Sequence, residues 1–422
     1  MNIRFRKQHQ EQGGILMITF FIASVIGIAL GSYLVLVRSQ NILVVRSQAW
    51  NAALAMAEAG AEEAMAQLNP GATEKTVMVD RTANGWGAPS GGLYGPITGR
   101  LTNSSYSVVF TDVPFPIIYS TGYVTVPSLS ATMARVVRVA TTNVPLFNVA
   151  MAALTNITDS GNGLASNSFD SANTNLSTNG KYDASKTSTN GDIASLYGTV
   201  DLGGHTINGD VFLGPTATLA GGTVTGSVHN DLNIDFPQVV LPADASSWVT
   251  LALATSGIVG GVLYNNVFLT SGDYIIPNLN GSIYIAPSAK VRLKVLAGGS
   301  GAIKIAGTGI SAGNLTIYMA SPSFSISGNT TVDSGNPANL TYFGLPSNKT
   351  ITFSGNATFT GAIYAPSADL TMNGGGGLNY DFVGSSITKS VTIHGKFMFH
   401  WDENLLNASP SRGYLAVSWR EI

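Results

Sequence analysis

Residues 283–288 read Ile-Tyr-Ile-Ala-Pro-Ser, residues 317–323 read Ile-Tyr-Met-Ala-Ser-Pro-Ser, and residues 363–367 read Ile-Tyr-Ala-Pro-Ser. A second pattern places an apolar residue two positions before a glycine, with glycines at 307, 328, 355, 374 and 395 that are 21, 27, 19 and 21 residues apart. A period near twenty built from short strands is typical of stacked coils that bury inward side chains against one another. The repeats predict a parallel, right-handed β-helix in a mainly β protein. A β-sandwich is the alternative, and the irregular period is its best support.

Short apolar alternations surround these repeats from about residue 191 onward. Val291, Leu293 and Val295 are one example, and such a period of two indicates strands. Residues 146–190 are instead rich in Ser, Thr, Asn and Gly, a composition that favours a linker. We therefore expect a linker over 146–190, a β-helix over 191–407 and a C-terminal tail over 408–422.

The N-terminal part carries a different signal, an uncharged run from Ile15 to Val37. At about 1.5 Å per residue this run forms a helix of roughly 35 Å, which exceeds the roughly 30 Å hydrocarbon core of a bilayer. A buried soluble helix is the alternative, but such helices rarely lack a polar stripe. Arg4, Arg6 and Lys7 precede the run and favour a cytoplasmic N-terminus. We expect a single-pass protein of the cytoplasmic membrane whose C-terminal region is periplasmic or on the cell surface.

The helix is predicted to continue beyond the membrane. Apolar residues recur at steps of three and four positions, which is the spacing of an amphipathic helix: Trp50, Leu54, Ala57, Ala61, Met65 and Leu68. Pro70 and Gly71 then end the pattern, since proline interrupts the hydrogen-bond ladder. We expect one helix over 15–69 whose second half packs on a soluble module.

Two segments carry a family resemblance. Gln12-Gly13-Gly14 follows the basic leader, and residues 57–62, Ala-Glu-Ala-Gly-Ala-Glu, close the helix; both resemble the N-terminus of PilX-type minor pilins and related pseudopilins. Residues 106–109, 120–122 and 135–139 resemble the strands that follow in those proteins, which implies a small pilin-like β module over 70–145.

The resemblance implies that a leader of residues 1–14 is cut by prepilin peptidase after Gly13 or Gly14. It also implies a role in a type IV pilus or pseudopilus, with other pilin or pseudopilin subunits as partners. An uncut leader, in which the two glycines only join leader and span, is the alternative. One departure is Thr19 (Ile18 for the earlier cut), where major pilins carry a glutamate that can pair with a neighbour's terminal amine. A tip or accessory subunit can lack that carboxylate.

The C-terminal half has its own resemblance. Residues 361–366, 391–395 and 400–405 resemble the β-helical domain that follows PilX-like N-termini in some bacterial envelope proteins. That likeness implies surface exposure, and it supplies no catalytic residues.

Composition excludes several kinds of chemistry. The 422 residues include no cysteine, so disulfides, Cys-ligated metals and thiol catalysis are excluded. The 21 basic and 23 acidic residues are nearly balanced, which argues against nucleic acid as a partner. The aspartates between residues 149 and 270 are candidate calcium ligands. No stretch has the Asp-x-Asx-x-Asx-Gly spacing that surrounds one ion, so carboxylates exposed to solvent in turns are the favoured interpretation. We expect no metal and no cofactor.

Catalysis is not expected either. Glycosidase chemistry needs two facing carboxyl groups, yet only Glu403 and Glu421 follow Glu74 among the glutamates. Coil stacking could bring together three aspartates whose spacing does not demand it: Asp369, Asp381 and Asp402. The histidines after residue 200 are scattered and have no metal-ligand spacing.

One charged cluster is a candidate ligand site. Lys290, Arg292 and Lys294 alternate along one predicted strand and would form a groove for an acidic polysaccharide, with a solvated outer face as the alternative. The sequence as a whole predicts a structural or accessory subunit that displays a β-helix for assembly or adhesion to a surface. The alternative is a membrane-anchored β-helix that binds or degrades polysaccharide.

Overall fold

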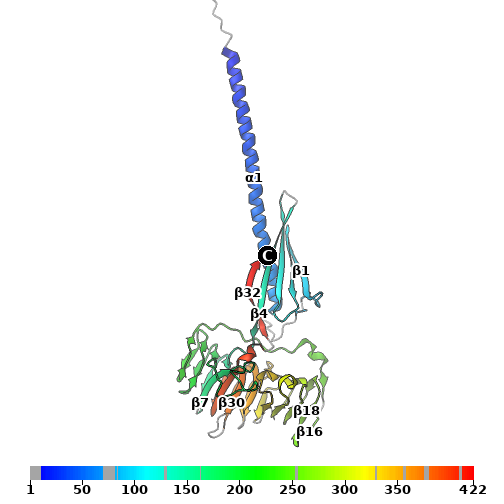
Figure 1. The fold of residues 1–422 in the computed structure, drawn as a ribbon, viewed down its shortest axis with the longest axis vertical. Coiled ribbons are helices and arrows are strands. Elements are labelled where there is room, and N and C mark those ends of the chain that lie inside the picture. Colours follow the sequence, from blue (N-terminus) through cyan, green and yellow to red (C-terminus); the bar gives the residue numbers. More distant parts are fainter. Residues whose placement is uncertain are drawn as a thin grey trace, which may run out of the picture. The chain divides into compact units, whose positions relative to one another are not determined.

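The computed structural model describes residues 11–69, 81–82, 84–127, 131–161, 163–251, 255–327, 330–354, 358–374, 380–407 and 411–422. The chain divides into two compact units. The first contains residues up to 67, 81–142 and 416–422, and the second contains mainly residues 143–415. Figure 1 shows one long helix and a chain that is otherwise built of strands. The protein is thus mainly β with a long N-terminal apolar helix.

The first unit combines this helix with an antiparallel sheet. Helix α1 (Glu11–Leu68) is unbroken, as predicted, while Pro70 and Gly71 lie outside the described residues. The sheet has the order β1-β2-β3-β4-β32. Its strands are β1 (Leu93–Leu101), β2 (Ser104–Thr111), β3 (Ile117–Val126), β4 (Ala131–Pro145) and β32 (Ser411–Glu421). The predicted tail of residues 408–422 is therefore wrong from residue 411 on, because those residues form a strand.

Small side chains form the seam between α1 and the sheet. The buried helix residues include Ala53, Ala57 and Ala61, whereas the predicted Trp50 is 45% exposed and packs under the Arg135 guanidinium, 4.8 Å from its ring centre. A Cβ added to Gly122 of β3 would collide with the backbone of α1 at Ala53 and Ala57. The absence of side-chain bulk lets the helix backbone approach the sheet, so the buried face is built mainly on smaller side chains than the apolar pattern predicts.

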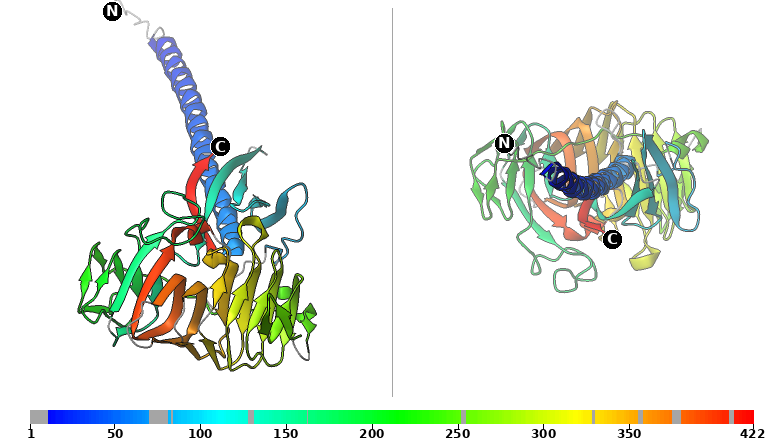
Figure 2. Two further views of the ribbon diagram at one scale, coloured as in Figure 1. Left: turned by 60° about the horizontal axis from the view of Figure 1, so that its bottom comes forward. Right: turned by 90° about the horizontal axis from the view of Figure 1, so that it is seen from above.

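The second unit consists of parallel strands stacked in successive layers (Figure 2). A layer here is a group of consecutive strands, such as β5, β6 and β7, that pairs with the next such group. The strands of the first set of layers are, in chain order, β5 (Met151–Ala153), β6 (Ile157–Asp159), β7 (Gly163–Phe169), β8 (Ile193–Ser195), β9 (Thr199–Asp201), β10 (Thr206–Ile207), β11 (Val211–Leu213), β12 (Thr218–Ala220), β13 (Thr223–Val224) and β14 (Val228–His229). Each strand from β5 to β11 pairs in parallel with the strand three places further on, such as β5 with β8 and β8 with β11.

A second set of layers follows, beginning with β15 (Val249–Thr250), the antiparallel hairpin β16 (Gly257–Val259) and β17 (Val262–Tyr264), β18 (Asn266–Phe268), β19 (Gly272–Ile276), β20 (Ile283–Ile285), β21 (Lys290–Val295), β22 (Ser300–Gly301), β23 (Ile303–Ile305), β24 (Asn314–Met319), β25 (Ser323–Ser327) and β26 (Thr331–Val332). It ends with β27 (Leu340–Gly344), β28 (Thr350–Ser354), β29 (Phe359–Asn373), β30 (Tyr380–His394) and β31 (Lys396–Asp402). Short 3-10 helices η1 (Ala243–Ser247), η2 (Gly309–Ser311), η3 (Pro337–Asn339) and η4 (Glu403–Asn407) lie between or after these strands. The parallel pairing makes the β-sandwich alternative wrong.

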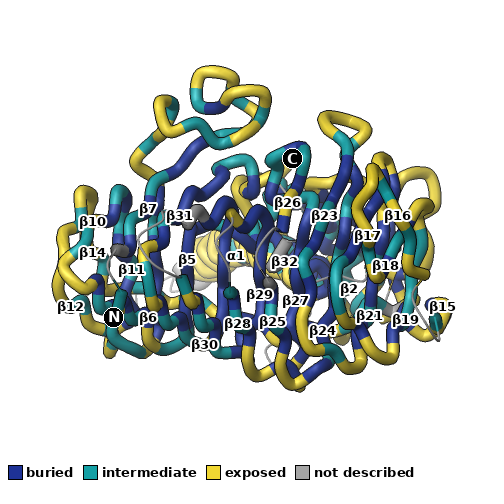
Figure 3. Tube along the Cα trace, turned by 90° about the horizontal axis from the view of Figure 1, so that it is seen from below, coloured by how far each residue is buried: buried dark blue, intermediate teal, exposed yellow. Residues whose placement is uncertain are grey.

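The two sets join through the last and first layers. Strand β30 pairs with β5 and β6, and β31 pairs with β7 over seven registered positions, from Lys396↔Gly163 to Asp402↔Phe169. The stack therefore begins at residue 249, rises to residue 402, continues at residue 151 and ends near residue 229. Its two ends come from the middle of the chain, with β14 at one end and β15 at the other (Figure 3).

The predicted linker of residues 146–190 is thus wrong for its first half. Strands β5, β6 and β7 lie within it and form a layer at the centre of the stack. Their inward residues, such as Met151, Ile157 and Leu164, are fully buried. The layer has few apolar residues because neighbouring layers on both sides supply the rest of the core.

The strand register shows which of the sequence repeats occupy equivalent positions in the stack. Four of the five apolar residues that precede a glycine, Ile326, Phe353, Met372 and Ile393, are in register on adjacent strands, whereas Ile305 lies in another sheet. Ile317 and Ile363 share one column through Tyr342. Ile283 lies instead in β20, which pairs with β18 and β23, so the first Ile-Tyr repeat is not equivalent to the other two. Similar strand-and-turn sequences recur in different columns because each column has the same local chemistry.

Residues 230–248 return the chain from one end of the stack to the other, and we call them the strap. Near the start of the strap, Leu232 N donates to Leu213 O of β11 at 2.9 Å. Just after its end, Leu251 N donates to Ile275 O of β19 at 2.9 Å. Between these points Tyr364 Oη donates to Pro237 O at 2.7 Å. The strap covers an outward-facing apolar column that includes Tyr318, Phe343 and Tyr364. The second unit therefore has one core inside the layers and another under the strap.

Candidate functional site

The first half of α1 is the most extensive exposed apolar surface of the described chain. Ile15 is 63% exposed, Phe20 76% and Leu34 65%. The segment is long and apolar enough to cross a membrane, and none of its most apolar window is buried. Exposing this surface to water would be unfavourable, because removing apolar surface from water gains roughly 25 cal/mol of free energy per Å². Its length and composition fit a single-pass membrane anchor.

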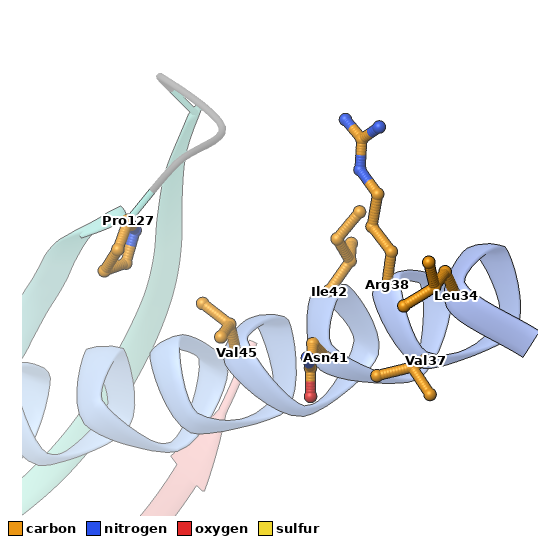
Figure 4. A pocket seen from close by; sticks show the side chains of 7 residues that line it. All are labelled: Leu34, Val37, Arg38, Asn41, Ile42, Val45 and Pro127. Carbon is orange, nitrogen blue, oxygen red and sulfur yellow. The ribbon is translucent and has the colours of Figure 1, made fainter. Parts of the chain in front are cut away.

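A cavity of about 370 Å³ lies where this apolar half approaches the sheet. Figure 4 shows Leu34, Ile42 and Val45 along α1, and Pro127 beyond the end of β3 facing the helix across the hollow. The Arg38 guanidinium extends at its rim (Figure 4). Most of the residues of α1 that line this hollow are apolar.

Most of the predicted leader, residues 1–14, lies outside the described part of the chain. Residues 1–10 lie outside the described residues, and only the backbone of Gly13 is described, within α1. Gly14 is exposed, and nothing approaches the position of an added Cβ within 4 Å. The Thr19 hydroxyl donates to its own helix, at Ile15 O (3.0 Å) and Leu16 O (2.9 Å). That hydroxyl is satisfied within the helix and does not replace the missing glutamate.

One of the three residues of the predicted basic groove, Arg292, is already paired with carboxylates. Lys290, Arg292 and Lys294 do share the outward side of β21, with alternate residues buried. Arg292, however, is bound to Asp273 (Nε to Oδ1, 2.6 Å) and to Asp244 of the strap, and its guanidinium lies 4.8 Å from the Trp248 ring centre. Two carboxylates neutralise this cation, because the strap crosses the strand at this point. The sequence could not place Asp244 there, 48 residues away.

Two of the three candidate aspartates, Asp369 and Asp402, have described side chains, and their surroundings differ. Asp369 accepts hydrogen bonds from Ser390 Oγ (2.6 Å) and Lys389 Nζ (3.2 Å). Asp402 is fully buried, and its Oδ1 accepts from Ser171 N (2.9 Å) and Asn404 N (3.1 Å). The Asp381 side chain lies outside the described residues. Asp369 thus binds side chains of β30, whereas Asp402 accepts from backbone N–H groups, and these hydrogen bonds have no donor in common.

Other aspartates also support the backbone. Asp192 Oδ1 accepts from Asp210 N (2.8 Å), and Asp210 Oδ1 accepts from Ser227 N (2.7 Å) on the next layer. These residues belong to a repeat that the sequence analysis missed, Gly191-Asp192-Ile193, Gly209-Asp210-Val211 and Gly226-Ser227-Val228. Within the described residues no group of three or more His, Asp or Glu is placed to hold a metal. The glycines of this repeat are 18 and then 17 residues apart, and this spacing is the sequence signal that could have revealed it.

Histidines acquire carboxylate neighbours only through stacking. His205 Nε2 lies 3.7 Å from the buried Asp159 Oδ2, and His229 Nε2 lies 3.5 Å from Asp210 Oδ2. His400 is buried, with Nδ1 2.7 Å from Asn167 Oδ1. Sequence spacing hides these pairs because the partners sit on different layers.

Asp402 provides a pH-dependent prediction. Burial raises its pKa from 3.8 to about 6, so protonation stabilises the folded chain below about pH 6 and that stability is lost as pH rises from about 4 through 6. Asp402→Asn is expected to be more stable than the original chain at pH 7, by about 3 kcal/mol at most, with the gain vanishing near pH 4. Urea unfolding at several pH values measures the difference.

Asp183→Asn is the matched control for this prediction. Hydrogen bonds from Thr178 and Ser185 lower the pKa of Asp183 to about 2, so its carboxylate is charged throughout this pH range. The control is expected to lower stability to a similar extent from pH 4 to pH 7. A gain for Asp402→Asn that does not change with pH would contradict the assignment.

The fold and the exposed helix define a mainly β protein with a single N-terminal apolar helix of membrane-spanning length. Within it, residues 268–408 match the profile of a family described as a domain of unknown function (DUF7305). The match runs from the last residue of β18 through η4, less than half of the chain, and names no activity.

The crystal structure of the competence-associated pilin ComZ from Thermus thermophilus is similar at 12% identity and a TM-score of 0.30, over 88% of this chain and 97% of that chain. No curated protein matches the sequence.

Proposed function

We propose that the chain is a structural or accessory subunit, similar to a minor pilin, of a type IV pilus or pseudopilus system. The observation that carries this proposal is helix α1 itself. Its first half exposes apolar side chains on all sides, and its second half packs through Ala53, Ala57 and Ala61 on a small antiparallel sheet. A helix built in this way can lie in the membrane before assembly and among other helices afterwards.

The cavity beside Pro127 supports assembly with other subunits. Its lining from α1 is mainly apolar, and it begins where the predicted membrane span ends. A neighbouring pilin or pseudopilin helix would bury Leu34, Ile42 and Val45, and would also cover Leu43 and Val44, which are more than half exposed. Thr19 in place of a glutamate fits an accessory position rather than a repeated one.

The second unit is proposed to be a parallel β-helix displayed outside the cytoplasmic membrane. The repeated parallel register, from β15 through β30 and β5 to β14, supports this assignment. We propose a structural or adhesive role rather than an enzymatic one, since Asp192 and Asp210 accept backbone hydrogen bonds between layers and Arg292 is paired with two carboxylates. In this arrangement the basic leader stays in the cytoplasm.

Processing of the leader tests the proposal. Native protein from cells with an active prepilin peptidase is expected to begin at Gly14 or Ile15, and protein from cells without the peptidase at Met1 or Asn2. Intact mass and N-terminal sequencing measure the start. Gly13→Val and Gly14→Val variants distinguish the two cut sites, because only the glycine before the cut is required, and Gly27→Val in the span is the control. Mature protein beginning at Met1 in peptidase-positive cells would remove the pilin assignment.

A further inference from the structure

A polar groove lies between a long loop and η2 in the second unit. The loop, residues 170–190, leaves β7 and returns to the layer that begins with β8. A cavity of about 630 Å³ separates its tip from Thr308 and Gly309. This volume is within the range of ordinary ligand pockets, about 300–1,000 Å³. Neither the pilin-like helix nor the strap takes part in it.

The loop is held in one conformation by its own hydrogen bonds. Thr178 and Lys181 exchange two backbone hydrogen bonds of 3.1 Å. Asp183 accepts from Thr178 Oγ1 (2.6 Å) and Ser185 N (2.9 Å), and Lys186 Nζ donates to Ser177 O (2.9 Å). A loop with this many internal bonds loses little conformational entropy when a ligand binds.

The base of the loop is anchored to the end of β31. Asp402 accepts from Ser171 N, and Glu403 Oε1 accepts from Ser168 Oγ (2.7 Å) and Asn190 Nδ2 (2.9 Å). Both ends of the loop are therefore fixed to one rigid layer. The groove wall is preformed.

Tyr182 supplies an aromatic surface in the groove. One face of its ring stacks on His400, with centroids 3.6 Å apart and planes 21° apart, and its edge meets Phe169 at 5.6 Å. His400 is fixed in turn by Asn167. Tyr182 is one of the residues that line the cavity, and His400 and Phe169 hold its ring in place.

The groups around Tyr182 indicate the class of ligand. Thr178, Asn179 and Thr308 offer uncharged donors and acceptors, and Lys181 and Asp183 contribute one charge of each sign. The balanced charge favours neither a polyanion nor a cation, and the polar lining does not suit an apolar chain. A fixed aromatic ring with surrounding hydroxyl and amide groups suits a sugar ring, which presents C–H bonds on its face and hydroxyl groups at its edge. An open groove accepts a chain of such rings.

We propose that the groove formed by the tip of the 170–190 loop and Thr308 binds a neutral glycan chain, with Tyr182 under one sugar ring. This site differs from the basic strand that the sequence indicated. The proposal does not depend on pilus assembly, since binding is measured on the purified full chain and does not require a processed leader.

The test is titration calorimetry of the full chain in detergent with maltohexaose, cellohexaose and mannohexaose, each up to about 10 mM, a range that detects Kd values in the millimolar class. At least one hexasaccharide is expected to bind. Tyr182→Ala should weaken that binding by about tenfold or more, a difference of about 1.4 kcal/mol. Thr308→Trp, which fills the groove from the opposite wall without altering the loop, should have the same effect.

Tyr197→Ala is the matched control, because Tyr197 is 63% exposed and does not line the groove. It should leave binding unchanged. Thermal unfolding of each variant separates lost binding from lost fold. The proposal is overturned if no hexasaccharide binds, if the acidic chain polygalacturonate binds in preference, or if folded Tyr182→Ala and Thr308→Trp bind as the original chain does.

Discussion

Gly122→Ala is expected to destabilise the first unit by about 3 kcal/mol, at the upper end of the usual cost of overpacking. The added Cβ would lie inside contact distance of Ala53 O and Ala57 N, and backbone atoms cannot rotate away as a side chain can. The helix must therefore move off β3 and open the seam of small residues. Thermal unfolding and limited proteolysis of the full chain in detergent measure the loss.

Gly31→Ala is the control for this substitution. Nothing lies within 4 Å of a Cβ added at Gly31, so alanine there is expected to leave the unit intact and to favour the helix by up to about 1 kcal/mol. Equal stability of the two variants would show that the helix does not pack on the sheet at this distance.

Trp248→Ala is expected to cost about 3–5 kcal/mol of unfolding free energy in the second unit, the usual range for a buried tryptophan. Trp248 ends the strap and is 6% exposed. Its ring meets the Tyr318 ring at 5.7 Å, edge to face, and Arg292 stacks on it. Alanine would leave a cavity above β24 and uncover part of the apolar column.

The control for the strap is Trp419→Ala. Trp419 lies on β32 and is 44% exposed, so the same change in chemistry should cost no more than about 0.5 kcal/mol. Urea unfolding compares the two variants. Similar losses would mean that the strap adds nothing to the stability of the stack.

The Trp248 substitution concerns the strap, whose path follows from the order in which the chain builds the stack. The stack is continuous from residue 249 to 402 and then from 151 to 229, so the strap must cross its length. An outward column containing Tyr318, Phe343 and Tyr364 would be an exposed apolar stripe without it. The strap solves this by covering the column and by pairing Asp244 with Arg292.

The sequence by itself determined the features that depend on local periodicity. The charge-free run from Ile15 to Val37 determined a helix of membrane-spanning length, and the steps of three and four determined its continuation to Leu68. Alternation determined strands such as β21, and the spacing before glycines 328, 355, 374 and 395 determined one column of the stack. These patterns are legible because each residue's role follows from near neighbours along the chain.

Only the tertiary structure decided which segments became neighbours. Residues 151–169 resemble a linker in sequence because they contain few apolar residues. Their layer is nevertheless part of the core, since β8 with Ile193 packs on one side of it and β30 on the other. Arg292 read as a free cation because its partner is 48 residues away on the strap. Tyr182 and His400 were separate, unremarkable residues until β31 paired with β7. Parallel stacking joins residues by layer order rather than by chain order, and a single sequence with irregular periods does not encode that order in any local pattern.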